Sequence, residues 1–344
     1  MPALTHRKPD KERMRAAILH QQTDEIPYWE GAICKRNLEF LFEREGMPDL
    51  SWALSPEDQV KLAEWTGQDV IPSSGGFLPT ARVREKDGSL RYLKEGELTT
   101  WELLDRLEPY TEEEIQAAVD RAQRGFDLVA GTGLGVWGCG GAFWQGAWQV
   151  VGFDEFMMKT VEDVEFCRRV IEYLAAPQVT AAEMLCERYP FLFYGIGDNI
   201  ATTKGPFLHP DLFKPLWCPW AEKIFAVARA NGIPTFLNTD GRIDWILDDF
   251  VAMGVDALNP VDPNGNDIFE VKEKYGDKLC LVGGINQHWP LATGAEQDVK
   301  ETVRDCIERL RGGGGYVVSS SHDIGDNVPP QNWVAMIRAV EKYG

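Results

Sequence analysis

The chain has 344 residues and a formal net charge of −19, from 54 acidic and 35 basic side chains. Such a field repels phosphate backbones and anionic lipid headgroups, which argues against a nucleic-acid partner and against a membrane-surface role. Hydrophobic residues make up 44% and charged residues 26%, a balance typical of an ordered globular chain. The 12 tryptophans are unusually many, and their large rings serve protein cores and aromatic pockets alike.

The sequence pattern favours a cytoplasmic protein. The polar N-terminal segment lacks the apolar core of a secretory signal, and no apolar run reaches the ~18–20 residues that a membrane span needs. The 7 cysteines are scattered, with no Cys-x-x-Cys pair. An odd and dispersed set suits a reducing compartment better than a disulfide framework.

The N-terminal third combines helices, two short strands and one hairpin. Helical patterns cover 13–21, 34–44 and 56–66 as an N-terminal helical extension, and apolar segments at 26–29 and 69–71 predict strands. Ser55 and Pro56 are the N-cap and the first-turn proline of the last of these helices. Residues 81–101 alternate polar and apolar side chains around Asp87-Gly88, so this segment predicts a β-hairpin outside the main fold.

From residue 111 onward, helices and strands alternate regularly. Further strands are predicted at 126–131, 191–195, 235–237, 256–258, 278–283 and 316–319. Helices are predicted from 111 onward and at 153–187, 210–230, 244–253, 268–275, 296–310 and 330–342.

Eight strands, each followed by helix, predict a parallel sheet closed into a (β/α)8 TIM barrel, with the whole chain, 1–344, as a single domain. An open doubly wound sheet is the alternative, but no Gly-x-Gly-x-x-Gly follows the first strand. Four glycines at 312–315 predict a helix end and tight turn rather than a phosphate cradle, because they precede a strand.

Polar side chains follow nearly every predicted strand. In such barrels the active site lies at the carboxyl-terminal ends of the strands, so these residues are candidates for a site. They are Glu30, Asp198, Asn199, Asn238, Asp240, Asn259, Asp262 and His322. Asn238 and Asp240 stand two residues apart, so in an extended chain both point the same way, toward the barrel axis. The alternative for each Asp and Asn is that it caps a helix or fills a turn.

Several motifs occur in a characteristic order over residues 195–344. They are Gly197-Asp198-Asn199-Ile200, Gly254-Val255-Asp256-Ala257-Leu258-Asn259-Pro260-Val261, Gly283-Gly284-Ile285 and Ser321-His322-Asp323-Ile324. In this order they resemble the second half of the uroporphyrinogen decarboxylase superfamily, and residues 143–156 resemble its first half more loosely. The resemblance implies a (β/α)8 barrel with the active site in its mouth.

The resemblance is closer to the cobalamin-dependent methyltransferases of this superfamily than to the true decarboxylases. The decarboxylases hold the carboxylates of a porphyrinogen with an Arg-Gln-Ala-Gly-Arg segment, where this chain has residues 28–32 with an acid, Glu30. The thiol-alkylating methyltransferases bind zinc through a His-x-Cys pair and a later Cys, which align with Asn238, Asp240 and His322. A zinc-thiolate site is therefore disfavoured, and if a metal is bound, Asp240 and His322 are its candidate ligands.

The resemblance implies a methyltransferase that moves a methyl group between a small donor, such as an aryl methyl ether or a methylamine, and a cobalamin. The chain lacks an Asp-x-His-x-x-Gly corrinoid motif, so a partner corrinoid protein has to bring the cofactor. O-demethylation needs a proton for the departing oxygen, which Asp240, Asp198 or His322 would supply. The candidates for substrate binding are Asn238, Asn199, Asn259, Asp262, Trp29, Glu30, Trp144 and Trp148.

Other interpretations stay open at this point. The protein is alternatively a decarboxylase of a small carboxylated substrate, since His322 matches the histidine position of the decarboxylases, or a non-catalytic tetrapyrrole- or corrinoid-binding protein. The three candidate tryptophans would stack on a flat ligand, but each can equally serve core packing. Members of the superfamily often form dimers, so the resemblance is compatible with a homodimer, but the sequence itself does not give the oligomeric state.

Overall fold

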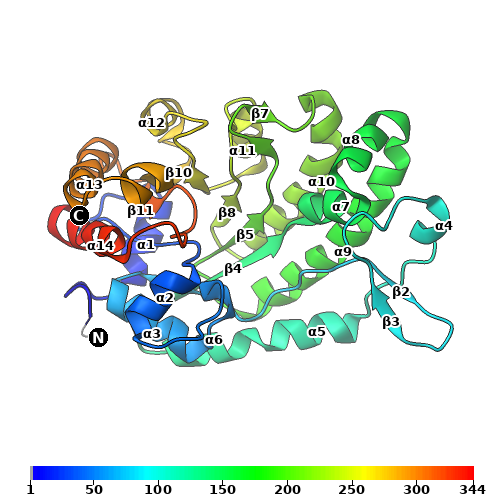
Figure 1. The fold of residues 1–344 in the computed structure, drawn as a ribbon, viewed down its shortest axis with the longest axis horizontal. Helices are drawn as coiled ribbons and strands as arrows, with labels where there is room; N and C mark the ends of the chain where they lie inside the picture. The colour runs from blue at the N-terminus through cyan, green and yellow to red at the C-terminus, as the bar shows by residue number, and fades with distance from the viewer. Residues whose placement is uncertain (1–2) are drawn as a thin grey trace.

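The computed structural model describes residues 3–344 and is built around a curled parallel sheet of seven strands (Figure 1). The strand order β1-β4-β5-β8-β9-β10-β11 follows the chain, as in a barrel made of successive strand–helix units. The strands are β1 Val70–Pro72, β4 Gly135–Gly141, β5 Phe193–Gly197, β8 Thr235–Asn238, β9 Ala257–Val261, β10 Cys280–Ile285 and β11 Tyr316–Ser320.

Residues 27–29 close the sheet between its two edges. Tyr28 pairs with Val318 of β11 in a parallel bridge, and the Val318 N–H donates to the Pro27 carbonyl at 3.0 Å. On the other side, the Asp69 N–H donates to the Tyr28 carbonyl at 3.4 Å, directly before β1. The segment therefore acts as the eighth strand. The predicted TIM-barrel fold is confirmed, and the alternative of an open doubly wound sheet is wrong.

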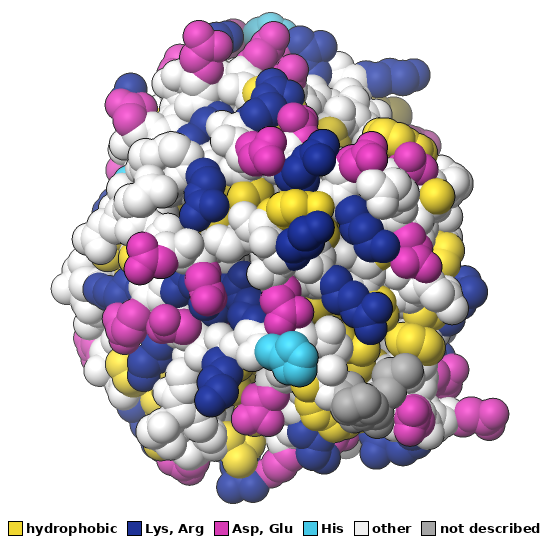
Figure 2. Space-filling model, turned by 90° about the vertical axis from the view of Figure 1, so that its left-hand side faces the viewer, with side chains coloured by type: hydrophobic (Ala, Val, Ile, Leu, Met, Phe, Trp, Pro, Cys, Tyr) yellow, Lys and Arg dark blue, Asp and Glu magenta, His cyan; other side chains and the backbone are white. Residues whose placement is uncertain are grey.

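Helices surround the sheet (Figure 1). They are α1 Lys11–Ile18, α2 Lys35–Phe42, α3 Pro56–Thr66, α4 Trp101–Leu104, α5 Glu112–Asp120, α6 Ala122–Val129, α7 Phe143–Val151, α8 Phe153–Glu162, α9 Val164–Arg188, α10 Pro210–Ala230, α11 Leu247–Met253, α12 Ile268–Tyr275, α13 Glu296–Leu310 and α14 Pro330–Tyr343. Within residues 3–344, none is both long enough and apolar enough to cross a membrane. On the side of α13 and α14, acidic and basic side chains are intermixed rather than segregated (Figure 2).

One end of the barrel is closed by packing. Aromatic and aliphatic side chains fill the interior together with residues of α1: Met14, Ala17, Ile18, Trp29, Val70, Phe193, Phe236, Val282 and Val317. The Gly315 N–H, just before β11, donates to the Ala17 carbonyl at 3.1 Å, so α1 covers the amino-terminal end of the strands. A site is therefore left at the opposite, carboxyl-terminal end.

The third strand lies further along the chain than predicted. Residues 126–131, predicted as a strand, form the end of α6 and the turn after it, and the strand is β4. The buried residues of α6 recur at helical spacing, while β4 contains four glycines, which weaken the strand signal. A Cβ on Gly138 would stand 2.5 Å from the ring of Tyr194, so close packing requires glycine in this strand.

The predicted hairpin is confirmed. β2 Arg82–Arg84 pairs antiparallel with β3 Leu90–Tyr92, across the turn that contains Asp87-Gly88. It stands at the edge of the molecule beside α4 (Figure 1). Arg82 pairs with Glu114 at 2.6 Å, which attaches the hairpin to α5.

The glycine run at 312–315 forms the predicted turn between α13 and β11. Gly313, Gly314 and Gly315 have φ of +78°, +72° and +68°, a region that favours glycine. A Cβ on Gly315 would also lie 2.6 Å from the ring of His20, so the turn packs directly against the segment that follows α1.

Candidate active site

His322 and Asp240 face each other across the mouth of the barrel. His322 follows β11 and Asp240 follows β8, strands that are separated by β9 and β10 in the sheet. His322 Nε2 lies 3.4 Å from Asp240 Oδ2, and Nδ1 lies 3.7 Å from Asp323 Oδ2. The side chains of His322 and Asp240 are 50% and 29% exposed, so the pair remains accessible to a ligand.

The two flanking carboxylates keep His322 protonated. The hydrogen bond to Asp240 is the main cause that raises the pKa of His322 to about 9, against the opposing effect of burial. The charges of Asp323 and Asp262 act in the same direction. At neutral pH the ring is therefore an imidazolium, a group able to give up a proton to a bound molecule.

Carboxamides predicted for the site lie around this pair. Asn199 Oδ1 accepts from the Asp240 N–H at 3.3 Å, which ties the loop after β5 to the loop after β8. Asn238 Nδ2 donates to Asn259 Oδ1 at 2.7 Å, between paired positions of β8 and β9. These two side chains therefore engage each other across the ends of neighbouring strands.

Asp262 is held in the loop that follows β9. Its Oδ1 accepts from the backbone N–H of Asn264 at 2.9 Å and from Nδ2 of the same residue at 2.8 Å. The side chain is buried, and its negative charge reaches His322, whose pKa it helps to raise. Asp262 therefore belongs to the electrostatic surroundings of the pair.

Asp198 points away from the mouth, into the layer of helices. Its Oδ2 accepts from the Trp144 N–H at 2.9 Å and from Trp217 Nε1 at 3.1 Å, and its Oδ1 accepts from the Gln145 N–H at 2.8 Å. Burial raises the pKa of Asp198 to about 7, against the effect of these three donors. The carboxyl group caps the N-terminus of α7, so the alternative that the sequence left open for Asp198 describes it here.

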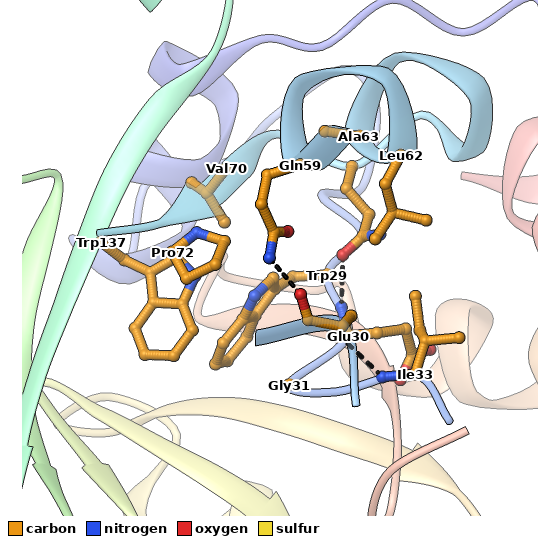
Figure 3. A pocket seen from close by; sticks show the side chains of 12 residues that line it. Trp29, Glu30, Gly31, Ile33, Gln59, Leu62, Ala63, Val70, Pro72 and Trp137 are labelled. Carbon is orange, nitrogen blue, oxygen red and sulfur yellow. Dashed lines mark hydrogen bonds between the residues drawn. The ribbon is translucent and has the colours of Figure 1, made fainter. Parts of the chain in front are cut away.

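Glu30 lies beneath the mouth and not on it. Ser320 of β11 contacts the carboxyl group with its backbone N–H and its hydroxyl, and the Glu30 N–H donates to Gln68 Oε1 at 2.9 Å. Beside it is a cavity of about 10 Å³ that Trp29, Trp137 and residues of α3 also line (Figure 3). This space fits about one water molecule, so a substrate does not reach Glu30 here.

The three predicted tryptophans are packed against other aromatic rings. Trp29 meets Trp137 edge-on inside the barrel with ring centroids 5.1 Å apart, and it is 2% exposed. Trp144 is fully enclosed between the rings of Phe156 and Phe213 in the helix layer. Trp148 is partly buried against Phe153. Trp29 and Trp144 thus have no free face for a ligand, which agrees with the packing alternative.

Two other tryptophans are exposed on loops beyond strand ends. Trp52 is 59% exposed, and its Nε1 donates to the Gly31 carbonyl at 2.8 Å. Trp289 is 56% exposed in the irregular π-helical segment Gln287–Ala292 that follows β10. Trp289 could have been predicted from the sequence, because it follows closely after a predicted strand, where the active sites of such barrels lie. Nothing in the sequence marks Trp52, because its position depends on how residues 31–54 fold over the barrel.

The residues do not form a zinc site. Within residues 3–344, no group of three or more His, Cys, Asp or Glu side chains is arranged to hold a metal ion. Asp240 and His322, the candidate ligands, are neighbours, but two ligands fall short of the three or four protein ligands of zinc centres. The donor set therefore does not fit zinc.

A parallel barrel with an imidazole and a carboxylate paired at its carboxyl-terminal mouth has the architecture of a barrel enzyme. The family model of uroporphyrinogen decarboxylase (URO-D) matches residues 92–343 of the chain. The chain therefore belongs to the uroporphyrinogen decarboxylase family, and the resemblance inferred from its motifs is confirmed.

Individual relatives match over shorter stretches. The uroporphyrinogen decarboxylases of Methylococcus capsulatus and Hydrogenovibrio crunogenus are each 30% identical, over 36% and 41% of this chain. The matched stretches span 35% and 40% of those enzymes, under half of their length. A methyltransferase from Methanosarcina mazei has the same fold, with a TM-score of 0.69 over 100% of this chain and 99% of that one, at 17% identity.

Proposed function

We propose that the protein is a methyltransferase in which His322 donates the proton that the oxygen of an ether donor needs when its methyl group leaves; a cationic methylamine leaves as a neutral amine and needs no such proton. The observation that carries this proposal is the imidazole of His322, held between Asp240 and Asp323 at the mouth of the barrel. When the methyl–oxygen bond of an ether breaks, the electron pair stays on oxygen, and the oxygen then takes a proton. A group with a pKa of about 9, as His322 has, suits the protonation of a phenolate, whose own pKa is about 10 for the tyrosine phenol.

The charge of the mouth favours a methyl donor without carboxylates. Asp240, Asp262 and Asp323 all act on His322, so the carboxylates around the ring outnumber the single positive charge. A neutral aryl methyl ether or a cationic methylamine is compatible with this field, whereas a polycarboxylate such as a porphyrinogen is repelled. The full-length fold similarity to a methyltransferase supports the same choice.

The methyl acceptor in this proposal is a corrinoid on a partner protein, which supplies the nucleophile when its cobalt is reduced. This chain contributes the remaining functions: Asp240 keeps His322 protonated, and the carboxamides of Asn199, Asn238 and Asn259 orient a polar donor. The exposed tryptophans Trp52 and Trp289 are candidates for contacts at the rim. No step of the proposal requires zinc.

The test is methyl transfer to free reduced cobalamin, followed by the absorbance change as methylcobalamin forms. Methoxybenzene-type donors, methylamines and a methoxybenzoate are compared under the same conditions. We expect transfer from uncharged methoxyarenes or methylamines, and slower transfer from the carboxylated analogue, by a factor that shrinks with added salt. Absence of transfer from every donor in the panel would contradict the proposal.

A decarboxylase is the second candidate, and family membership favours it. Loss of CO₂ from a substrate leaves a carbanion, and an imidazolium such as His322 is able to protonate that carbon. The same protein preparation is therefore assayed for CO₂ release from small carboxylated pyrroles and aromatic acids. Release of CO₂ without methyl transfer would favour this second function over the first.

A further inference from the structure

Glu30 is a buried carboxyl group that the proposed chemistry does not use. The residue is 4% exposed and contacts the end of β11. The Ser320 N–H lies 3.2 Å from both carboxyl oxygens, and Ser320 Oγ lies 2.5 Å from Oε2. His322 follows two residues after Ser320, so the group that Glu30 contacts belongs to the segment that carries the proposed proton donor.

The hydroxyl group of Ser320 stands between two oxygen atoms. Besides Glu30 Oε2, it contacts the backbone carbonyl of His322. Within residues 3–344, no second donor contacts that carbonyl. A serine has one hydroxyl hydrogen, so both contacts are hydrogen bonds only when Glu30 carries a proton of its own. Glu30 then donates to Ser320 Oγ, and Ser320 donates to the His322 carbonyl.

The surroundings of Glu30 favour this protonated form. Tyr28 lies on the same segment, and Asp323 lies beyond β11. The uncharged amide of Gln59 comes from α3 (Figure 3), and that of Gln68 comes from the residues that follow α3. No lysine or arginine of the described chain lines the cavity beside it. Burial is the main cause that raises the pKa of Glu30 to about 8, and the negative charge of Asp323 adds to it. The hydrogen bonds from Ser320 and from Tyr28 lower the pKa, but burial outweighs them.

We propose that Glu30 is a positioning residue whose protonated carboxyl group, acting through Ser320, fixes the backbone at His322 and thereby orients the imidazole toward Asp240. The proposal rests on the proposed role of His322 as the proton donor. When Glu30 ionises, its carboxylate competes for the Ser320 hydroxyl hydrogen, and the His322 carbonyl loses its donor. The position of His322 therefore depends on pH in a way that the ring's own titration does not explain.

Nuclear magnetic resonance (NMR) titration of the full chain tests the contact without any assay of activity. The imidazole signals of His322 are assigned by comparison with His322→Gln. In the wild type we expect two inflections, one near pH 9 from the ring and one near pH 8 from Glu30. In Glu30→Gln, whose amide still donates to Ser320 Oγ, the lower inflection disappears and the upper one stays. The proposal is overturned if the wild type lacks the lower inflection or if Glu30→Gln retains it.

Kinetics of the proposed methyl transfer provide the second measurement. Glu30→Ala and Ser320→Ala should lower kcat roughly 10- to 100-fold with little change in KM, because they misplace the proton donor and leave the binding residues in place. Glu30→Gln should recover most of that loss. Equal losses in the Gln and Ala variants would overturn the positioning role. If the wild-type protein shows no methyl transfer, the proposed function is overturned. The positioning role of Glu30 is not, because the NMR titration tests it without any assay of methyl transfer.

Discussion

The protonation of His322 depends chiefly on one neighbour, Asp240, whose Oδ2 lies 3.4 Å from the ring. We expect Asp240→Asn to lower the pKa of His322 from about 9 toward its ordinary value of 6.5, by more than about one unit, because the amide cannot stabilise the imidazolium as a carboxylate does. NMR titration of the ring measures this shift. Asp244→Asn is a matched control, since Asp244 lies on the same loop and pairs with Arg242 instead.

The same contact makes the stability of the fold depend on pH. A pKa that is higher in the folded state stabilises the protein below about pH 6.5, and this contribution is lost as the pH rises through about 9. The difference in the free energy of unfolding between wild type and Asp240→Asn is therefore expected to be larger at about pH 6 than at about pH 10. Urea denaturation measures it. The effect should be modest, because the His322 side chain is half exposed. A difference that grows with pH would contradict the assignment.

At the scale of single residues, the strand pattern predicts which residues follow the strand ends, but it does not predict the direction in which each side chain points. His322 and Asp240 meet because both follow strands of one barrel, which the strand count reveals. Asp198 also follows a strand, yet its side chain turns outward, because the N-terminus of α7 offers it two backbone donors. α7 itself lacks a local N-cap side chain, so its start carries no sequence signal, and its capping residue comes from far along the chain.

At the scale of secondary-structure elements, Asp198 is expected to stabilise α7. Asp198→Ala leaves three N–H donors without a partner, two of them buried, and we expect it to lower the free energy of unfolding by about 2 kcal/mol or more. Asp267→Ala is the control, because Asp267 caps α12 at an exposed position and should cost about 1 kcal/mol. Chemical denaturation compares the two. Equal, small losses of unfolding free energy in the two variants would show that Asp198 stabilises the protein no more than an exposed helix cap does.

The glycines of α6 and β4 should respond to alanine in opposite directions. Gly125 lies within α6 with nothing within 4 Å of an added Cβ, so Gly125→Ala is expected to stabilise the protein by about 0.5–1 kcal/mol. In β4, a Cβ on Gly138 would stand 2.5 Å from the Tyr194 ring, so Gly138→Ala should destabilise it by about 1–3 kcal/mol. Thermal unfolding measures both. Destabilisation by Gly125→Ala would argue that residues 122–129 are not helical.

Several helices were predictable because all the signals in their sequences indicate the same structure. The predicted ranges 210–230, 268–275 and 296–310 coincide with α10, α12 and α13, each amphipathic and the first opened by a proline. The strand β4 was missed for the opposite reason, since its glycines carry little strand propensity and allow close packing, as Gly138 does against Tyr194. The segment 26–29 was predicted as a strand, but only the bridge of Tyr28 to Val318 and its hydrogen bond with the Asp69 N–H reveal that this segment closes the barrel.

At the scale of the whole molecule, the barrel brings together the ends of strands that are far apart in the sequence. α1 closes the amino-terminal end, and the opposite mouth holds the imidazolium of His322 among carboxylates. Most of the 12 tryptophans stabilise this architecture by packing, as Trp29 and Trp144 do. The proposal of an uncharged or cationic substrate rests on the carboxylates around His322. It does not rest on the number of tryptophans.

The measurement that tests the central claim most directly is the single-turnover rate of methyl transfer from a methoxyarene to reduced cobalamin, at neutral pH, for wild type and His322→Gln. With His322 as the proton donor, the wild type forms methylcobalamin, and His322→Gln does so roughly 10²- to 10⁴-fold more slowly. His209→Gln, which alters an exposed histidine at the start of α10, is the matched control and should keep the wild-type rate. A wild-type rate in His322→Gln would contradict the claim.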